Sequence, residues 1–176
     1  DSVAPTLNAS LAANSKVAAN TLLSFTASEP IRSGITFSAS GCTFDPPTLT
    51  GQVVTANLVS RSSQGSFSLT IYFADLAGNS GTLSIAYVYD SLGPTFTPSL
   101  AANNHVKSNT LLSFTANEAV QSSGISVVAP DCTFDPPSLS GQNISTNFVG
   151  CTAQGNFSLT VTVLDLAGNT GTRTIT

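Results

Sequence analysis

Charged residues are scarce in this sequence. Only 8% of its 176 residues are charged, whereas about 25% is usual for a soluble protein. Nine acidic and five basic residues give a net charge of -4, and the basic residues stand singly. Because no basic stripe is available to neutralise a row of phosphates, we expect no nucleic-acid binding. No apolar run approaches the ~20 residues that span a bilayer, so we expect no membrane insertion of this segment.

Residues suited to acid–base or metal chemistry are also few. The chain has one His, His105, which follows Asn103 and Asn104 in a polar stretch. Catalysis by side chains needs a nucleophile, a base and an orienting group, and a single His does not supply the ligand spacings of a zinc site. We therefore expect His105 on an exposed loop and predict that the protein is not an enzyme.

An internal repeat organises the chain. Its offset is 89 residues up to a one-residue insertion that precedes Cys132, and 90 residues after it. The clearest matches are Thr21–Ala27 with Thr110–Ala116, Cys42–Pro47 with Cys132–Pro137, and Asp75–Asn79 with Asp165–Asn169. A period of this length is that of a whole domain. Since Asp1–Thr6 matches Asp90–Thr95, we predict two domains, residues 1–89 and 90–176.

Apolar and polar residues alternate within each copy. Along 67–73, four large apolar residues alternate with Ser68, Thr70 and Tyr72, and residues 157–163 repeat the pattern. A period of two is typical of antiparallel strands with one buried face, and clusters of Gly, Pro, Asn and Asp separate the runs. The sequence therefore predicts an all-β fold of two tandem immunoglobulin-like β-sandwich domains, with about seven strands each.

Three recurring motifs resemble a known family. They are the Asp…Pro-Thr opener at Asp1–Thr6 and Asp90–Thr95, the Phe-Thr-Ala segment that precedes Glu29 or Glu118, and the Asp-x-Ala-Gly-Asn turn near the end of each copy. In this order and spacing the chain resembles the tandem immunoglobulin-like repeats of large microbial extracellular surface and adhesin proteins, of the bacterial kind. The resemblance covers both copies and implies a segment of a stalk, fibre or adhesin.

The recurring acids raise the question of a calcium site. The candidate residues are Asp75, Asn79 and Glu29 in the first copy, Asp165, Asn169 and Glu118 in the second, and Asp90 between them. A junction that gathers the turn Asp, a Glu and the linker Asp would offer oxygens to Ca²⁺, which takes roughly 6–8. The alternative, which we favour, is that the Asp and Asn shape a turn with Gly at positive φ.

Three cysteines are unevenly shared between the copies. Cys42 matches Cys132, whereas Cys151 matches Arg61. We predict a Cys132–Cys151 disulfide, whose separation of 19 residues corresponds to a stabilisation of roughly 3 kcal/mol in the chain-entropy model. The alternative is three small buried thiols. Cys42 is then either a buried thiol or a link to another chain.

Three N-glycosylation sequons begin at Asn8, Asn143 and Asn156. Asn156 precedes an inward-facing Phe by one residue, so its side chain is expected to face outward. Sequons together with a disulfide favour an extracellular or cell-surface location and a glycoprotein.

We therefore expect a structural repeat unit of an extracellular fibre, stalk or adhesin, whose partners are neighbouring copies of the protein or further repeats of the same chain. The sequence shows no signal peptide, and the second copy stops three residues short of the period. We expect either a piece of a longer covalent array or subunits joined by strand exchange. The alternative function is a glycan- or protein-binding module that uses the outward-facing Tyr72, which is otherwise a cross-strand packing residue.

Overall fold

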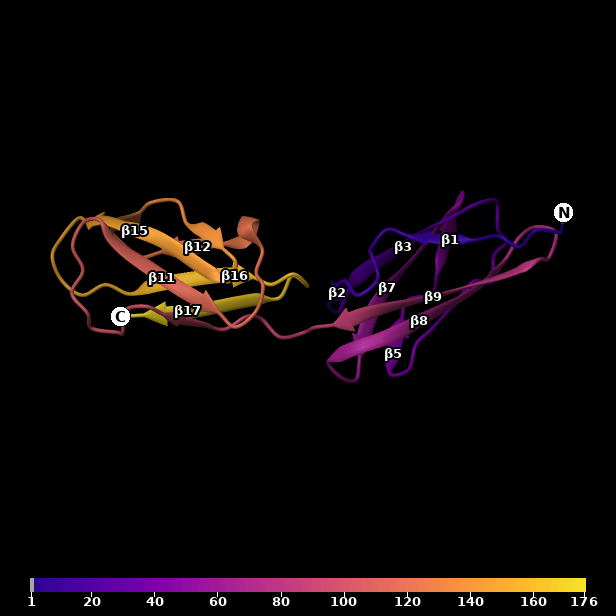
Figure 1. The fold of residues 1–176 in the computed structure, drawn as a ribbon, viewed down its shortest axis with the longest axis horizontal. Helices are drawn as coiled ribbons and strands as arrows, with labels where there is room; N and C mark the ends of the chain where they lie inside the picture. The colour runs from indigo at the N-terminus through magenta and orange to yellow at the C-terminus, as the bar shows by residue number, and fades with distance from the viewer. Residues whose placement is uncertain (1) are drawn as a thin grey trace. The chain divides into compact units, whose positions relative to one another are not determined.

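The computed structural model describes residues 2–176, and Asp1 of the predicted opener lies outside the described residues. The backbone forms two compact units, of which unit 1 ends at Ser91 and unit 2 is Leu92–Thr176 (Figure 1). Within the described residues, no helix has the length and apolar content needed to cross a membrane.

Unit 1 consists of two sheets. Its strands are β1 (Leu7–Ala9), β2 (Lys16–Val17), β3 (Thr21–Ala27), β4 (Thr36–Ser38), β5 (Cys42–Phe44), β6 (Thr48–Thr50), β7 (Val53–Arg61), β8 (Gly65–Ala74) and β9 (Ser80–Tyr89). One sheet has the order β1-β3-β7-β5, with β6 also paired to β7, and the other has the order β2-β9-β8-β4. The pairing is antiparallel except between β2 and β9, which are parallel.

Unit 2 repeats this topology with two differences. Its strands are β10 (Phe96–Pro98), β11 (Thr110–Ala116), β12 (Ser126–Val128), β13 (Cys132–Phe134), β14 (Ser138–Ser140), β15 (Asn143–Cys151), β16 (Leu159–Leu164) and β17 (Thr170–Ile175). The sheets have the orders β10-β11-β15-β13, with β14 on β15, and β12-β16-β17. A 3₁₀ turn at Ser122–Gly124 lies in the region of the one-residue insertion, and no strand of the described part of unit 2 corresponds to β2.

The core of each unit is formed by the inward residues of both sheets. In unit 1, Leu23, Phe25 and Val54 of one sheet belong to the same buried cluster as Leu69 and Ile71 of the other. In unit 2, Ile144 of one sheet and Val161 of the other likewise belong to one buried cluster. The predicted alternation is therefore confirmed, because period-two runs place every second side chain between the sheets.

Asparagine and glycine enable the turns between these strands. Asn14 and Asn20 both have φ of 65°, and so do their equivalents Asn103 and Asn109. Asn is one of the few residues that adopt this left-handed conformation at low cost. The repeated Asn positions thus have a backbone reason.

The Pro-Thr opener enters each unit beside its last strand. A Cβ on Gly81 would lie 2.6 Å from the Pro5 carbonyl oxygen, and one on Gly171 would lie 2.0 Å from that of Pro94. The next residue, Thr6 or Thr95, donates its backbone N–H to the side chain of Ser28 or Asn117, respectively. The opener and the Gly after the turn recur together because only Gly allows this approach.

These features confirm the all-β immunoglobulin-like sandwich, since the strands of each unit form two sheets that enclose one core, as in that fold. Within the described residues, unit 1 has nine strands and unit 2 has eight, more than the expected seven or so. The additional strands are short. β2 has two residues, and β5 and β6 lie along successive parts of one edge of β7.

Candidate functional site

The Asp-x-Ala-Gly-Asn segments form a hydrogen-bonded turn in each unit. In unit 1 the backbone N–H and the side-chain amide of Asn79 donate to the two carboxylate oxygens of Asp75, at 2.8 and 2.7 Å. Gly78 completes the turn with a φ of 96°. Asp75 is 2% exposed. Burial acts to raise the pKa of Asp75, but the hydrogen bonds from Asn79, Gly78 and Ala77 outweigh it and hold that pKa below its usual value.

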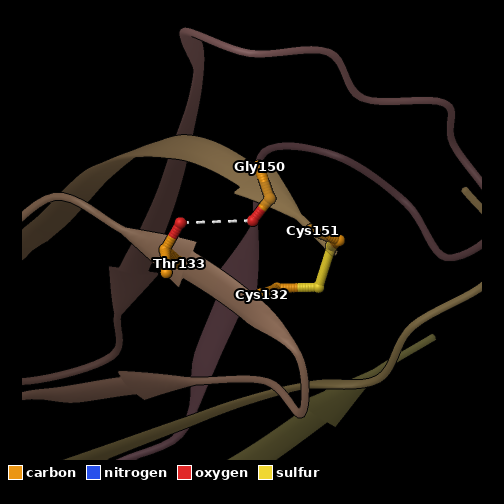
Figure 2. Close-up of a disulfide and its surroundings, with 4 residues drawn as sticks. All are labelled: Cys132, Thr133, Gly150 and Cys151. Atoms are coloured by element: carbon orange, nitrogen blue, oxygen red, sulfur yellow. Dashed lines mark hydrogen bonds between the residues drawn. A yellow bond between two sulfur atoms is a disulfide. The ribbon is translucent and has the colours of Figure 1, made fainter. Parts of the chain in front are cut away.

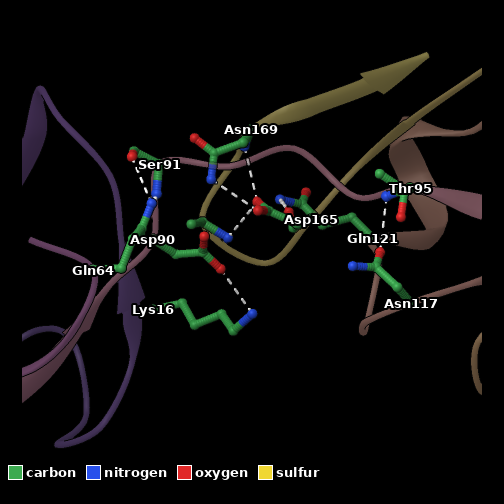
Figure 3. A network of polar contacts seen from close by, with 10 residues as sticks. Lys16, Gln64, Asp90, Ser91, Thr95, Asn117, Gln121, Asp165 and Asn169 are labelled. Carbon is green, nitrogen blue, oxygen red and sulfur yellow. Dashed lines mark hydrogen bonds and ion pairs between the residues drawn. The ribbon is translucent and has the colours of Figure 1, made fainter.

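The turn of unit 2 has the same bonds at a fully buried carboxylate (Figure 3). Asp165 Oδ1 accepts the backbone N–H groups of Ala167 and Asn169, both at 2.8 Å, and Oδ2 accepts the side-chain amide of Asn169 at 2.8 Å. The Asp165 carbonyl oxygen also accepts Gln121 Nε2 at 2.6 Å. Both carboxylate oxygens of Asp165 therefore accept hydrogen bonds within the turn.

The other calcium candidates lie near these turns or at the end of unit 1. In unit 2, carboxylate oxygens of Glu118 and Asp165 lie within 4.8 Å of each other. In unit 1, Glu29 is half-buried, and Asp90 accepts Lys16 Nζ at 2.9 Å as an ion pair (Figure 3). Asp90 belongs to unit 1 and the other two acids to unit 2, so the expected gathering of the three at a junction stays a prediction. Calorimetric titration with calcium, with and without a chelator, separates calcium binding from turn shaping alone.

A second recurring acid shapes the fold in a way that the sequence analysis missed. Asp45 Oδ2 accepts Asn57 Nδ2 at 3.0 Å, and Asp135 Oδ2 accepts Asn147 Nδ2 at 3.0 Å. In both units the Asp precedes two prolines and the Asn lies on the neighbouring strand, β7 or β15. The signal was present, because Asp and Asn recur together at a spacing of 12 residues, but only the structure places them side by side.

The cysteines occupy equivalent places in the two units. Cys132 and Cys151 are direct partners in the β13–β15 register, and a disulfide joins them (Figure 2). In unit 1 the equivalent register partners are Cys42 and Arg61. Cys42 is a free, half-buried thiol. Burial raises the pKa of the Cys42 thiol, while the Arg61 guanidinium acts in the opposite direction.

Arg61 holds the β7–β8 loop where unit 2 has its disulfide. Its guanidinium donates to the carbonyl oxygens of Ser63, Gly65 and Ser66. The guanidinium carbon also lies 5.4 Å from the ring centroid of Phe67, within cation–π range. Its Nε is buried without a hydrogen-bond partner.

The remaining sequence candidates lie on the surface. Asn8, Asn143 and Asn156 of the sequons are exposed, with Asn8 and Asn143 on strands and Asn156 in the segment before β16. Asn143 Oδ1 accepts the Thr115 hydroxyl. His105 is exposed and outside the strands, as expected.

Tyr72 faces outward from β8 with 52% of its surface exposed. Its register partners on the two neighbouring strands are Thr36 and Thr82. The equivalent position in unit 2 is Thr162. Tyr72 is therefore a surface residue of one unit and not a shared feature of the repeat.

Comparison with known proteins gives structural likenesses alone. No protein-family model matches the chain, and no curated protein matches it. Solved structures similar to it include the fibronectin(III)-like modules of CbhA from Clostridium thermocellum, with 14% identity, a TM-score of 0.44 and coverage of 96% of this chain and 91% of the other.

Two further structures are similar over most of the chain. The C-terminal domain of the AgI/II polypeptide BspA from Streptococcus agalactiae has 10% identity, a TM-score of 0.37 and coverage of 97% and 98%. The Bacteroides ovatus protein SGBP-B, solved with a mixed-linkage heptasaccharide, has 14% identity, a TM-score of 0.36 and coverage of 97% and 46%. At these scores the likenesses carry no argument about function.

Proposed function

We propose that the protein is a non-catalytic structural repeat of an extracellular fibre, stalk or adhesin, joined end to end with neighbouring domains. The observation that carries this proposal is the role of the recurring acids. Asp75 and Asp165 form the same turn in both units, and Asp45 and Asp135 make the same bond to an Asn on the neighbouring strand, β7 or β15. Repeated polar residues that serve the fold are those that a structural array retains.

The outward faces of the sheets support the same proposal. Neutral hydroxyl groups pair across strands in both units, at Thr48 with Thr55, Ser68 with Ser84, Ser138 with Ser145, and Thr160 with Thr174. Such pairs stabilise sheets by roughly 0.2–1 kcal/mol each and do not depend on salt. A surface of this kind suits a module whose environment varies in ionic strength.

Covalent chemistry supports an extracellular location. The Cys132–Cys151 disulfide belongs to an oxidising compartment. The three exposed sequon residues, Asn8, Asn143 and Asn156, are accessible to glycosylation in such a compartment. A glycosylated surface with few charges fits an exposed filament or stalk.

Electron microscopy of the native source tests the proposal. An antibody raised against the recombinant chain and coupled to gold is expected to label extended extracellular filaments or stalks. Boiling in detergent before electrophoresis then separates two arrangements: a covalent array stays long, and a strand-exchanged fibre dissolves into short subunits. Label confined to compact isolated particles, or to the cell interior, would falsify the proposal.

A second candidate function is glycan or protein binding through Tyr72. The favouring observation is its exposed ring near the end of β8, which unit 2 replaces by Thr162. An exposed aromatic ring can stack on an apolar partner face. A glycan array probed with the chain and with Tyr72→Thr, which copies unit 2, distinguishes the two functions. Specific binding lost in the variant would favour the binding module, and equal signals from both proteins would remove Tyr72 as a contact residue.

A further inference from the structure

The two residues that follow β9 are held by side chains of unit 1. The repeat places Asp90 and Ser91 at the opening of the second copy, but in the structure both belong to unit 1. Lys16 Nζ, on β2, lies 2.9 Å from Asp90 Oδ2. Gln64, directly before β8, donates from Nε2 to Ser91 Oγ at 2.7 Å and accepts the Ser91 N–H at Oε1 at 3.2 Å (Figure 3). The dipeptide is therefore bound from both sides of β9, whose neighbours in the sheet are β2 and β8.

Both contacts extend the backbone pairing of β9. On the β2 side three backbone hydrogen bonds are present, from the N–H groups of Asn14, Val88 and Asp90 to the carbonyl oxygens of Ala86, Ser15 and Val17, respectively, at 2.8, 3.0 and 2.9 Å. On the β8 side the antiparallel register reaches Gly65 opposite Tyr89. Gln64 binds Ser91 just beyond that pair. The dipeptide thus lies at the end of two ladders at once.

The directions of these strands determine how tension along the chain acts on them. β2 and β9 are parallel, and the chain passes through β2 before it leaves unit 1 after β9. Tension therefore pulls the start of β2 and the end of β9 in opposite directions along the strand axis, so that the bonds between them are loaded together. β8 and β9 are antiparallel, and their pair at Gly65 and Tyr89 is the first that the same tension opens.

The two side chains act at the points that the load reaches first. Tension from the residues after unit 1 passes Ser91 and Asp90 before it reaches β9. The bonds of Gln64 to Ser91 close the open end of the β8–β9 pair, where pair-by-pair separation begins. The ion pair of Lys16 with Asp90 adds one bond to the group that must break together. Its side chains are only 29% and 16% exposed, so solvent ions screen it incompletely.

We propose that Asp90 and Ser91 form a mechanical catch of unit 1, which transfers tension along the chain through Lys16 to β2 and through Gln64 to β8. The catch delays the separation of β9 from its two neighbouring strands. It lies within unit 1 and is a property of the chain itself. The proposal therefore goes beyond the proposed function and is tested without the native filament.

The test is single-molecule unfolding of the full chain at constant load, with handles at its two ends. The longer step belongs to unit 1, because the disulfide withholds part of unit 2 from extension. Lys16→Met and Gln64→Ala are each expected to unfold unit 1 roughly fivefold faster, since each removes contacts that the load must break. The matched control, Lys107→Met with Gln154→Ala, removes the same kinds of side chain from unit 2, where Gln154 is the equivalent of Gln64. It is expected to leave the step of unit 1 unchanged.

A second pulling geometry separates load bearing from ordinary stability. Gln52 lies in the turn between β6 and β7, and its carbonyl oxygen accepts the N–H of Ala27, which is paired with Leu7, the first residue of β1. Handles at the N-terminal end and at an azide-bearing residue in place of Gln52 load unit 1 without tension through Asp90. In this geometry Lys16→Met and Gln64→Ala are expected to change the unfolding rate little. Equal acceleration in both geometries, or an unchanged rate in the end-to-end geometry, would overturn the proposal.

Discussion

The two units have the same sandwich but stabilise one equivalent position differently. At the first residues of β5 and β13, unit 1 places Cys42 opposite Arg61, and unit 2 places Cys132 opposite Cys151. Arg61 holds the loop that follows it by hydrogen bonds and by its contact with Phe67. The disulfide instead links strands 19 residues apart in sequence. A covalent link and a set of polar contacts can replace each other here because the core beneath is the same.

The difference extends to the strand that follows. In unit 1, β8 starts at Gly65, directly within reach of the Arg61 guanidinium and paired with the end of β9. In unit 2, β16 starts only at Leu159. The sequences 67–70 and 157–160 are identical, yet the first lies wholly within β8 and the second enters β16 only at Leu159. The comparison separates what the local sequence specifies from what a neighbouring strand supplies.

The largest effect is expected from the buried turn of unit 2. Asp165→Ala removes the acceptor of three hydrogen bonds from Ala167 and Asn169 at a carboxylate that is 0% exposed. The variant is expected to lose about 3 kcal/mol of unfolding free energy, because it leaves donors without acceptors. Denaturant unfolding measures the loss. Leu166→Ala, in the same turn but 54% exposed, is the control and is expected to change little; an equally small loss for Asp165→Ala would contradict the account of the turn.

Removal of the disulfide leaves unit 2 without a covalent cross-link, as in unit 1. The double variant Cys132→Ser with Cys151→Ser is expected to lose about 3 kcal/mol, since the unfolded chain regains the freedom that the cross-link removes. Cys42→Ser is the matched control, because it changes the equivalent residue of unit 1, which has no disulfide. If thermal unfolding shows the same loss for both, the disulfide has no particular role.

The reverse exchange is expected to stabilise unit 1. Arg61→Cys places a thiol opposite Cys42 in the register that unit 2 uses for its disulfide. The gain is expected to be about 1–2 kcal/mol, because the new link is offset by the lost contacts of Arg61 with Ser66 and Phe67. Mass spectrometry with and without reductant shows whether the bond forms, and the stability of the oxidised variant is then compared with that of the wild type. Two free thiols after oxidation would show that the two registers are not equivalent.

Acid is expected to weaken the turn of unit 1. The pKa of Asp75 is lower in the folded state than its usual value, so its carboxylate stabilises the fold above that usual value, and this contribution is lost as the pH falls through the folded-state pKa. Asp75→Asn removes the titrating group and is expected to flatten the corresponding part of the stability–pH curve. The measurement is a series of denaturant titrations from neutral to acid pH. A curve for Asp75→Asn that parallels the wild type would contradict this assignment.

The smallest effect concerns the free thiol. Because burial raises the pKa of Cys42, its alkylation by iodoacetamide is expected to be slow at neutral pH, and its rate is expected to rise to a half-maximum above the usual cysteine pKa. Arg61→Ala removes a nearby positive charge that lowers this pKa and is expected to move the half-maximum further upward. A downward movement would show that the guanidinium does not act on Cys42.

The sequence predicted those features that depend on local pattern. The alternation along 67–73 identified β8 and its buried face, because a period of two has only one structural meaning in a sandwich. The recurrence of Asp75 with Asn79 identified the turn and its shaping role. These residues act through neighbours that are close in sequence, so their spacing contains the information.

Features that depend on pairing between distant segments were not predictable. β2 has two residues, too few for a local pattern, and is identified only by its parallel pairing with the end of β9. The bonds from Asn57 to Asp45 require a register between β7 and the loop before β6 that no local rule specifies. The role of Arg61 was missed for the same reason. Its alignment with Cys151 shows that unit 1 lacks the second cysteine, but it does not show that the guanidinium binds the loop that follows.

Single-molecule force spectroscopy tests the central claim that each copy is an independent, load-bearing sandwich. The chain, held between handles at its two ends, is expected to unfold in two separate steps. The step from unit 2 is expected to be shorter by about 65 Å, because the disulfide withholds 19 residues of ~3.5 Å each from extension. Reductant is expected to remove that difference and leave the step of unit 1 unchanged. A single step that releases the whole chain, or two steps that ignore the reductant, would contradict the account.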